Sequence, residues 1–213
     1  MDQPDFETSE LGTKAYWDAV YDRENTNFNE IGDIGEIWFG EESVQKMVQW
    51  VCDHVTDPQS SIVDLGCGNG HLLLELAAEG YKNLHGIDYS EAAITLAKSV
   101  AQQREYGFIK YDTVDLLAGT WDAQFDVILD KGTFDAISLN PELPDARQKY
   151  VSAVRKIIKP QGLVLITSCN WTQDELVKLF GSEFVYHSHV KYPTFSFGGH
   201  SGSKICTVAF STK

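Results

Sequence analysis

Apolar residues recur along this chain with two different periods. From Lys14 to Val55 the pattern is helical in two pieces, and the second piece has apolar residues at helical spacing from Val44, behind Ser43 as a capping residue. After residue 60 the period changes to short apolar runs that alternate with helical stretches. The predicted strands are 61–65, 84–89, 108–111, 125–129, 163–167, 184–192 and 204–211, and the predicted helices are 71–78, 90–103, 145–158 and 172–180.

This order predicts an α/β fold with a mostly parallel sheet, because strands and helices alternate until the last two strands. Those two have no helix between them, so we expect an antiparallel last strand at the edge of the sheet. Residues 1–12 are predicted to be a disordered acidic tail, and 13–213 a single domain. Within it, 13–58 form an N-terminal helical cap and 59–213 the core. A ligand crevice is expected at the carboxyl ends of the first strands.

The first predicted strand runs through a glycine-rich loop directly into a helix. The loop reads Asp64-Leu65-Gly66-Cys67-Gly68-Asn69-Gly70. A dinucleotide-binding loop has the spacing G-x-G-x-x-G, whereas here the third glycine comes one position earlier. The acid Asp64 favours a ligand with a cationic amino group over a pyrophosphate. The loop therefore predicts a nucleoside ligand that carries an amino group.

Two further acids complete an adenosine-shaped site. Asp88 ends the second strand about twenty residues after the glycines, where an acid can accept both ribose hydroxyls; the alternative is a plain acid at a helix N-terminus. Tyr89 would line the adenine pocket or belong to the core. Asp115, in preference to Asp112, would accept the adenine amino group beside Leu116; the alternative is a solvated turn.

The net charge and the cysteine content limit the kinds of partner and the cell compartment that we expect. The net charge is −14, and residues 1–60 hold 14 acidic and three basic groups, which gives 3 − 14 = −11. This sign disfavours DNA and RNA and favours a cationic partner, although an acidic N-terminus can also serve solubility alone.

Four scattered cysteines without a C-x-x-C pair indicate free thiols in the cytosol. His187 and His189 lack further ligands, so no metal is expected. No apolar run could span a membrane, and we expect a monomer.

Several longer segments resemble one family of enzymes. They are Leu11-Gly12-Thr13, Tyr16-Trp17-Asp18-Ala19-Val20-Tyr21, Gly35-Glu36-Ile37-Trp38-Phe39-Gly40, Asp130-Lys131-Gly132-Thr133-Phe134-Asp135-Ala136-Ile137-Ser138-Leu139-Asn140, Ile166-Thr167-Ser168-Cys169-Asn170-Trp171-Thr172 and Phe195-Ser196-Phe197-Gly198-Gly199. With the glycine loop, they resemble the class I seven-stranded methyltransferases, and more narrowly the protein-lysine methyltransferases of translation elongation factor 1-alpha. The resemblance covers nearly the whole chain from Leu11 onward.

The resemblance implies a Rossmann-like, doubly wound seven-stranded sheet with helices on both faces, and S-adenosyl-L-methionine as cofactor. The expected cofactor-binding residues are Trp38, Asp64, Gly66, Gly68, Asn69, Gly70, Asp88, Tyr89, Asp115, Leu116 and Asp130. Asp130 ends the fourth strand and is expected to orient the incoming lysine, with Phe134 as the second catalytic residue. Phe134, Trp38 and Trp171 would form the channel wall, or else pack in the core.

Other functions remain open at this point. A small-molecule methyltransferase would share every cofactor feature, and a non-catalytic cofactor-binding scaffold is a further alternative. Enzymes that methylate adenine or glutamine usually carry Asn/Asp-Pro-Pro-Tyr/Phe after the fourth strand. This chain has Asp130-Lys131-Gly132-Thr133 there, so a nucleic-acid substrate is disfavoured by motif as well as by charge.

Overall fold

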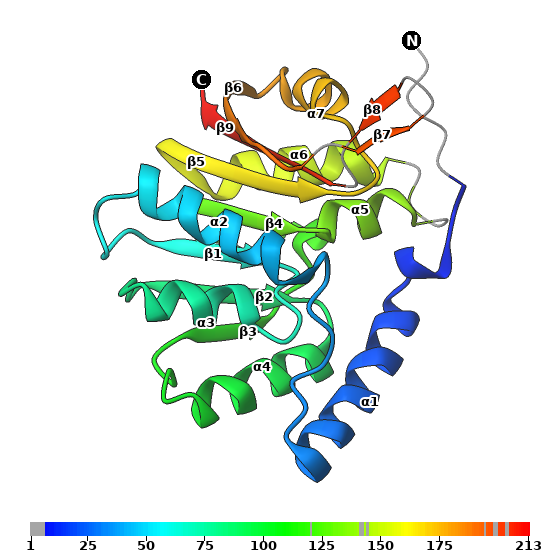
Figure 1. Ribbon diagram of the computed structural model, residues 1–213, viewed down its shortest axis with the longest axis vertical. Coiled ribbons are helices and arrows are strands. Elements are labelled where there is room, and N and C mark those ends of the chain that lie inside the picture. Colours follow the sequence, from blue (N-terminus) through cyan, green and yellow to red (C-terminus); the bar gives the residue numbers. More distant parts are fainter. Residues whose placement is uncertain are drawn as a thin grey trace.

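A seven-stranded sheet forms the centre of the computed structural model, which describes residues 7–119, 121–140, 143, 145–193, 195–197, 200–202 and 205–213 (Figure 1). The strands, in spatial order, are β3 (Lys110–Thr113), β2 (Leu84–Asp88), β1 (Ile62–Leu65), β4 (Phe125–Lys131), β5 (Ile158–Ser168), β9 (Cys206–Thr212) and β6 (Phe184–Val190). The alternation of strands and helices therefore predicted the fold class correctly. A two-stranded ribbon of β7 (Phe195–Phe197) and β8 (His200–Gly202) was not predicted, and Gly198 and Gly199 lie outside the described residues.

The last strand runs antiparallel, as predicted, but it does not lie at the edge. It is inserted between β5 and β6 and pairs antiparallel with both. Val208 and Phe210 of β9 are fully buried, whereas Val185 and Tyr186 of β6 are 48% and 39% exposed. The more apolar strand takes the inner position because only there are both of its faces covered.

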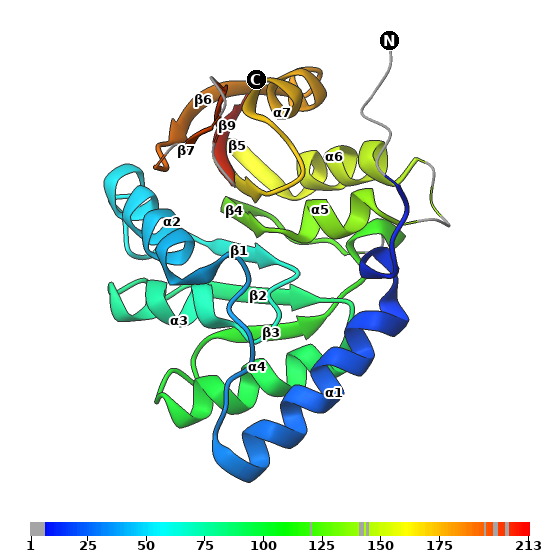
Figure 2. The same ribbon diagram turned by 45° about the vertical axis from the view of Figure 1, so that its right-hand side comes forward.

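Helices cover both faces of the sheet (Figure 2). The helices are α1 (Lys14–Ile31), α2 (Gly40–His54), α3 (His71–Ala78), α4 (Glu91–Gln103), α5 (Thr133–Ser138), α6 (Ala146–Ile157) and α7 (Gln173–Phe180). One core cluster contains α2, α3 and α4, and a second contains α5, α6 and α7. Helix α1 lies against the outside of α4, where the Asn25 side-chain amide donates to the Ala92 carbonyl at 2.8 Å. Within the described residues, no helix is long and apolar enough to cross a membrane.

Local capping signals explain most helix starts. The Ser90 hydroxyl accepts from the backbone N–H of Ala93, and Thr172 forms a capping box with Glu175. The prediction that Ser43 caps helix α2 is wrong. Helix α2 begins one turn earlier, and the buried Ser43 hydroxyl donates to the Gly40 carbonyl at 2.8 Å. Helix α5 was also not predicted, because it is shorter than two turns.

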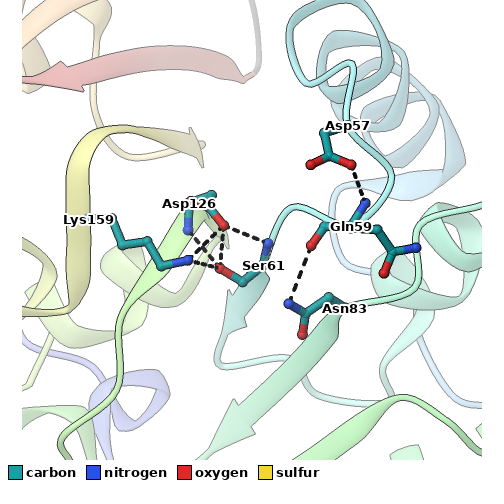
Figure 3. A network of polar contacts seen from close by, with 6 residues as sticks. All are labelled: Asp57, Gln59, Ser61, Asn83, Asp126 and Lys159. Carbon is teal, nitrogen blue, oxygen red and sulfur yellow. Dashed lines mark hydrogen bonds and ion pairs between the residues drawn. The ribbon is translucent and has the colours of Figure 1, made fainter.

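The amino ends of β1 and β4 are tied by a polar network (Figure 3). The Asp126 carboxylate accepts from the Ser61 N–H at 2.8 Å, the Ser61 hydroxyl at 2.6 Å and the Lys159 ammonium at 2.9 Å. Nearby, the Asn83 side chain donates to the Gln59 carbonyl at 3.4 Å. Since these strands are parallel, the network fixes the strands whose opposite ends carry the candidate site.

Candidate active site

A cavity of about 420 Å³, called here the large cavity, opens at the carboxyl ends of β1, β2 and β4. Many of the residues expected from the sequence to bind a cofactor line it: Trp38, Gly66, Gly68, Asn69, Asp88, Tyr89, Asp115 and Leu116. Asp64, Gly70, Asp130 and Phe134 do not line it. The structure thus brings together residues from loops far apart in sequence.

The glycine loop has no room for side chains where it meets its neighbours. Gly66 and Gly68 have φ angles of 62° and 53°, in the left-handed region that favours glycine. A Cβ on Gly66 would overlap the Thr133 side chain, and one on Gly68 would lie 2.5 Å from the Tyr21 hydroxyl oxygen. The result is a bare backbone cradle on the floor of the large cavity. Such a cradle suits close approach by a ligand.

Asp88 holds the loop from the end of β2. Its carboxylate accepts from the N–H of Gly68 at 3.2 Å and from the N–H of Ser90 at 2.9 Å. Burial raises the pKa of Asp88 to about 6, although these two hydrogen bonds oppose the rise. The carboxylate lines the large cavity and has capacity for further hydrogen bonds, since each oxygen has two lone pairs.

Asp115 and Leu116 form the part of the cavity beyond β3. Asp115 precedes the short 3₁₀ helix η2 (Leu116–Ala118), and its carboxylate accepts from the Leu117 N–H at 2.9 Å. Asp112, the alternative acid, instead pairs with His85 at 2.7 Å and does not line the cavity. Asp115 is therefore the acid available to a ligand there.

Asp64 lies beneath the loop, beside a second, small cavity of about 20 Å³ that it shares with His71 and Lys131. Asp64 is 3% exposed, and burial raises its pKa while the charge of Lys131 lowers it. Lys131 lines both cavities. Asp64 thus lies next to the glycine loop and Lys131 without lining the large cavity itself.

Asn69 ties the segment before α2 to the glycine loop. Its amide nitrogen donates to the carbonyls of Ile34 at 3.0 Å and Glu36 at 3.3 Å, and its oxygen accepts from the His71 N–H at 3.2 Å. The Trp38 carbonyl accepts from the Lys131 ammonium at 3.0 Å. These contacts place Trp38 on the cavity surface.

Asp130 and Phe134 lie away from the large cavity, which differs from the role expected of them. Asp130 is fully buried, and its carboxylate accepts from the Tyr150 hydroxyl, the Thr133 N–H at 2.9 Å and the Phe134 N–H at 3.0 Å. Phe134 is fully buried against Tyr150, and Trp171 is 5% exposed against Phe134. None of the side chains of Asp130, Phe134 and Trp171 lines the large cavity.

Asp135 lines the large cavity one turn into α5. Its carboxylate accepts from the Ser168 hydroxyl and from the Cys169 N–H at 2.8 Å, and burial raises its pKa. Cys169 and Asn170 line the cavity beside it. Hydrogen bonds therefore connect segment 130–135 with segment 168–171, and the residue that makes them is Asp135 and not Asp130. The sequence prediction chose Asp130 and did not consider Asp135, which lies in a helix that was not predicted.

The segment before α1 also closes the cavity, and the sequence did not predict this. Residues 9–13, called here the N-terminal strap, include a 3₁₀ turn, η1 (Glu10–Gly12). The Ser9 N–H donates to the Leu139 carbonyl at 3.2 Å, and the Trp17 indole donates to the Leu11 carbonyl at 2.7 Å. Leu11, Gly12, Trp17 and Tyr21 line the cavity. Residues 1–6 of the expected tail lie outside the described residues.

Acidic groups dominate the charged lining of the large cavity. The charged residues that line it are four acids and two lysines: Glu36, Asp88, Asp115, Asp135, Lys14 and Lys131. Such a lining favours a ligand with more positive than negative charge. Among the described residues, no group of three His, Cys, Asp or Glu side chains could hold a metal ion.

The strand order, the glycine loop and the cavity at the strand ends define a class I methyltransferase fold. The solved structure of magnesium protoporphyrin IX methyltransferase from Synechocystis, with bound SAM, superposes with a TM-score of 0.64 at 18% identity and covers 91% of this chain and 97% of that one. The N-methyltransferase NodS of Bradyrhizobium japonicum, in complex with S-adenosyl-l-homocysteine, gives 0.64 at 15% identity, with 91% and 98% covered. Likenesses at these identities establish the fold alone.

Sequence comparison narrows this class to a family. Residues 30–205 match the family described as "Methyltransferase domain". The chain is 44% identical over 207 residues to "EEF1A lysine methyltransferase 2" of Homo sapiens, covering 96% of this chain and 88% of that protein. It is 45% identical over 223 residues to "Protein-lysine N-methyltransferase efm4" of Schizosaccharomyces pombe, covering 95% and 94%. This chain belongs to the methyltransferase family that contains these two proteins.

Proposed function

We propose that this protein is an S-adenosylmethionine-dependent lysine methyltransferase whose substrate is translation elongation factor 1-alpha. The observation that carries the proposal is the similarity to relatives named for this activity along almost their full length, from fish and mammals to yeasts. The segments that first suggested the substrate, at 130–140 and 169–172, lie together at one end of the large cavity through Asp135.

The residues that line the cavity fit the proposed cofactor in the chemistry of their donor set. The backbone of Gly66 and Gly68 lines the cavity without side chains, so a ligand could approach it closely. Asp88 would hold the ribose hydroxyls, and Asp115 with Leu116 the adenine. The acidic lining suits the two positive charges of S-adenosylmethionine. Bound there, the cofactor supplies a methyl group on a sulfonium, which a neutral lysine amine takes up with release of S-adenosylhomocysteine and a proton.

The protein must make the acceptor amine neutral. A free lysine has a pKa of about 10.4, so its neutral form costs roughly 4.6 kcal/mol at pH 7. Apolar surface lowers the pKa of an entering ammonium, and Trp38 and Ile137 provide such surface in the cavity. The carboxylate of Asp135 would orient the amine beside Asn170. In this proposal Asp130 is a positioning residue, because it fixes the start of α5 and hence Asp135.

The remaining expectations form part of the same proposal. We infer a cytosolic enzyme that acts as a monomer on a protein and not on nucleic acid. All four cysteines are free thiols, which suits a reducing compartment, and the net charge of −14 repels phosphate backbones.

The direct test is methyl transfer from isotopically labelled S-adenosylmethionine to purified elongation factor 1-alpha, with the product mapped by mass spectrometry. Label on a lysine of that protein is the expected result. An unlabelled factor, with methylation of a small amine in the same assay, would show a small-molecule methyltransferase.

Two variants locate the acceptor end. Asp135→Asn should lower turnover with elongation factor by at least about tenfold while cofactor affinity changes little, because the lost charge faces the amine. Asp112→Asn removes a carboxylate that pairs with His85 outside the cavity, and it should leave turnover unchanged. Equal turnover in the two variants would remove Asp135 from the acceptor site.

A further inference from the structure

Two lysines line a cavity whose proposed ligand carries two positive charges. Lys14 is the first residue of α1, and Lys131 is the last residue of β4. A lysine beside a sulfonium and a second incoming lysine weakens binding by like-charge repulsion. S-adenosylmethionine also has one negative group, the α-carboxylate of its methionine part. A lysine at that place would be favourable instead.

Lys131 lines the large cavity and has hydrogen-bonding capacity left there. It projects from β4 on the same face of the sheet as Asp64, and one donor of its ammonium is used on the Trp38 carbonyl at 3.0 Å. Lys131 and Asp64 both line the small cavity, and the charge of each shifts the pKa of the other. An ammonium has three donors, so hydrogen-bonding capacity remains where Lys131 lines the large cavity.

The order of the strands places Lys131 at the correct end of the ligand. The candidate adenosine contacts are Asp115, beyond β3, and Asp88, at the end of β2. Strand β1 separates β2 from β4, so Lys131 lies about two strand spacings, or roughly 10 Å, from the ribose position. The amino-acid part of a ligand extended along the strand ends reaches that distance.

We propose that Lys131 binds the α-carboxylate of the methionine part of the cofactor, a role that rests on the proposed function. Its hydrogen bond to the Trp38 carbonyl then holds the ammonium in place. Burial lowers the pKa of Lys131, and Asp64 and Asp130 raise it. A bound carboxylate would raise it further and keep the lysine charged.

Lys14 provides a matched control within the same cavity. Its ammonium pairs with Asp18 at 2.7 Å, its side chain is half-exposed, and it lies 5.7 Å from the centre of the Tyr89 ring. That position is beside the adenosine contacts and away from β4. Lys14→Met therefore removes a positive charge from the cavity without touching the proposed carboxylate position.

The test compares S-adenosylmethionine with its decarboxylated form, because the two differ only in the carboxylate and keep both positive charges. Their dissociation constants are measured by calorimetry for the wild type, Lys131→Met, Lys131→Gln and Lys14→Met. The wild type should prefer the carboxylated form by about 10- to 100-fold, as expected for a buried charge-assisted hydrogen bond. Both Lys131 variants should reduce the preference to about threefold or less, while Lys14→Met leaves it intact.

The decarboxylated form should bind the Lys131 variants as well as the wild type, or better, since a repulsive charge is gone. Weakening of both ligands by one factor would overturn the proposal and leave Lys131 only its structural contact with Trp38. A wild type without preference would overturn it even if both variants failed to fold. A wild type that binds neither ligand would overturn the proposed function as well.

Discussion

Gly12→Ala tests whether the N-terminal strap closes the large cavity. A Cβ on Gly12 would lie 2.5 Å from the Asn140 nitrogen and 2.5 Å from the Leu139 carbonyl carbon, whereas ordinary contact begins at 3.4 Å. Both are backbone atoms and cannot rotate away. The strap and the end of α5 must therefore separate by about 3.4 − 2.5 = 0.9 Å.

The expected cost follows from the contacts that this shift breaks. The Ser9–Leu139 hydrogen bond, at 3.2 Å, is worth about 0.5–1.5 kcal/mol. If that energy is lost from the closed cavity, cofactor affinity falls by about 2- to 13-fold. The strap belongs to neither core cluster. Global stability should therefore change by at most about 1 kcal/mol, or roughly 2–4 °C in melting temperature.

The assay is calorimetric binding of S-adenosylhomocysteine together with thermal unfolding. Gly107→Ala is the matched control, because its Cβ would meet only the end of the flexible Gln102 side chain, at 2.8 Å, and Gly107 does not line the cavity. Unchanged affinity in Gly12→Ala would refute the closing role of the strap. A large fall in melting temperature would show that the strap is part of the folding core.

Three further predictions concern carboxylates. Asp88→Asn should weaken cofactor binding by about 10- to 100-fold; because burial raises the pKa of Asp88 to about 6, wild-type affinity should fall as the pH drops below 6, and calorimetry of the variant should lack this dependence. Burial raises the pKa of Asp130 to about 7. The protonated carboxyl therefore contributes its full stability below about pH 4, and the free energy of unfolding falls by up to about 1.4 kcal/mol per pH unit as the pH rises to 7. Asp130→Asn should reduce this pH dependence in urea titrations of the cofactor-free protein. Asp126→Ala should cost about 1–2 kcal/mol of stability in the same titration, because the Ser61 contacts are lost, and methylation should not change.

The elements that sequence predicted well are those whose cause is local. Helix α3 follows the glycine loop at the predicted residues, and Ser90 and Thr172 cap their helices through atoms three residues away. The start of α2 depends instead on Phe39, a non-glycine residue with a φ of 65°. The position of β9 between β5 and β6 depends on how well each strand is covered, which the order of elements does not contain.

In the site, too, the residues with a local sequence signal were predicted and those that depend on distant contacts were not. Asp88 was predicted as a candidate because it ends the second strand about twenty residues after the glycine loop, and Asp115 because it follows the third strand. Both line the cavity. The strap was missed because its contact joins Gly12 to Asn140, residues that are distant in sequence. Short acidic segments of this kind have no apolar period, so nothing in the local pattern separates a docked strap from a free tail.

Asp130 shows that a strand-end position is not enough to place a side chain. Side chains alternate between the two faces of a strand, and in β4 Ile128 packs with the α5–α7 cluster while Leu129 packs with the opposite one. Counting on by two puts Asp130 on the Ile128 face, toward Tyr150, and Lys131 on the Leu129 face with Asp64. The alternation was available in the sequence, and it assigns Asp130 to holding α5 and Lys131 to the cavity.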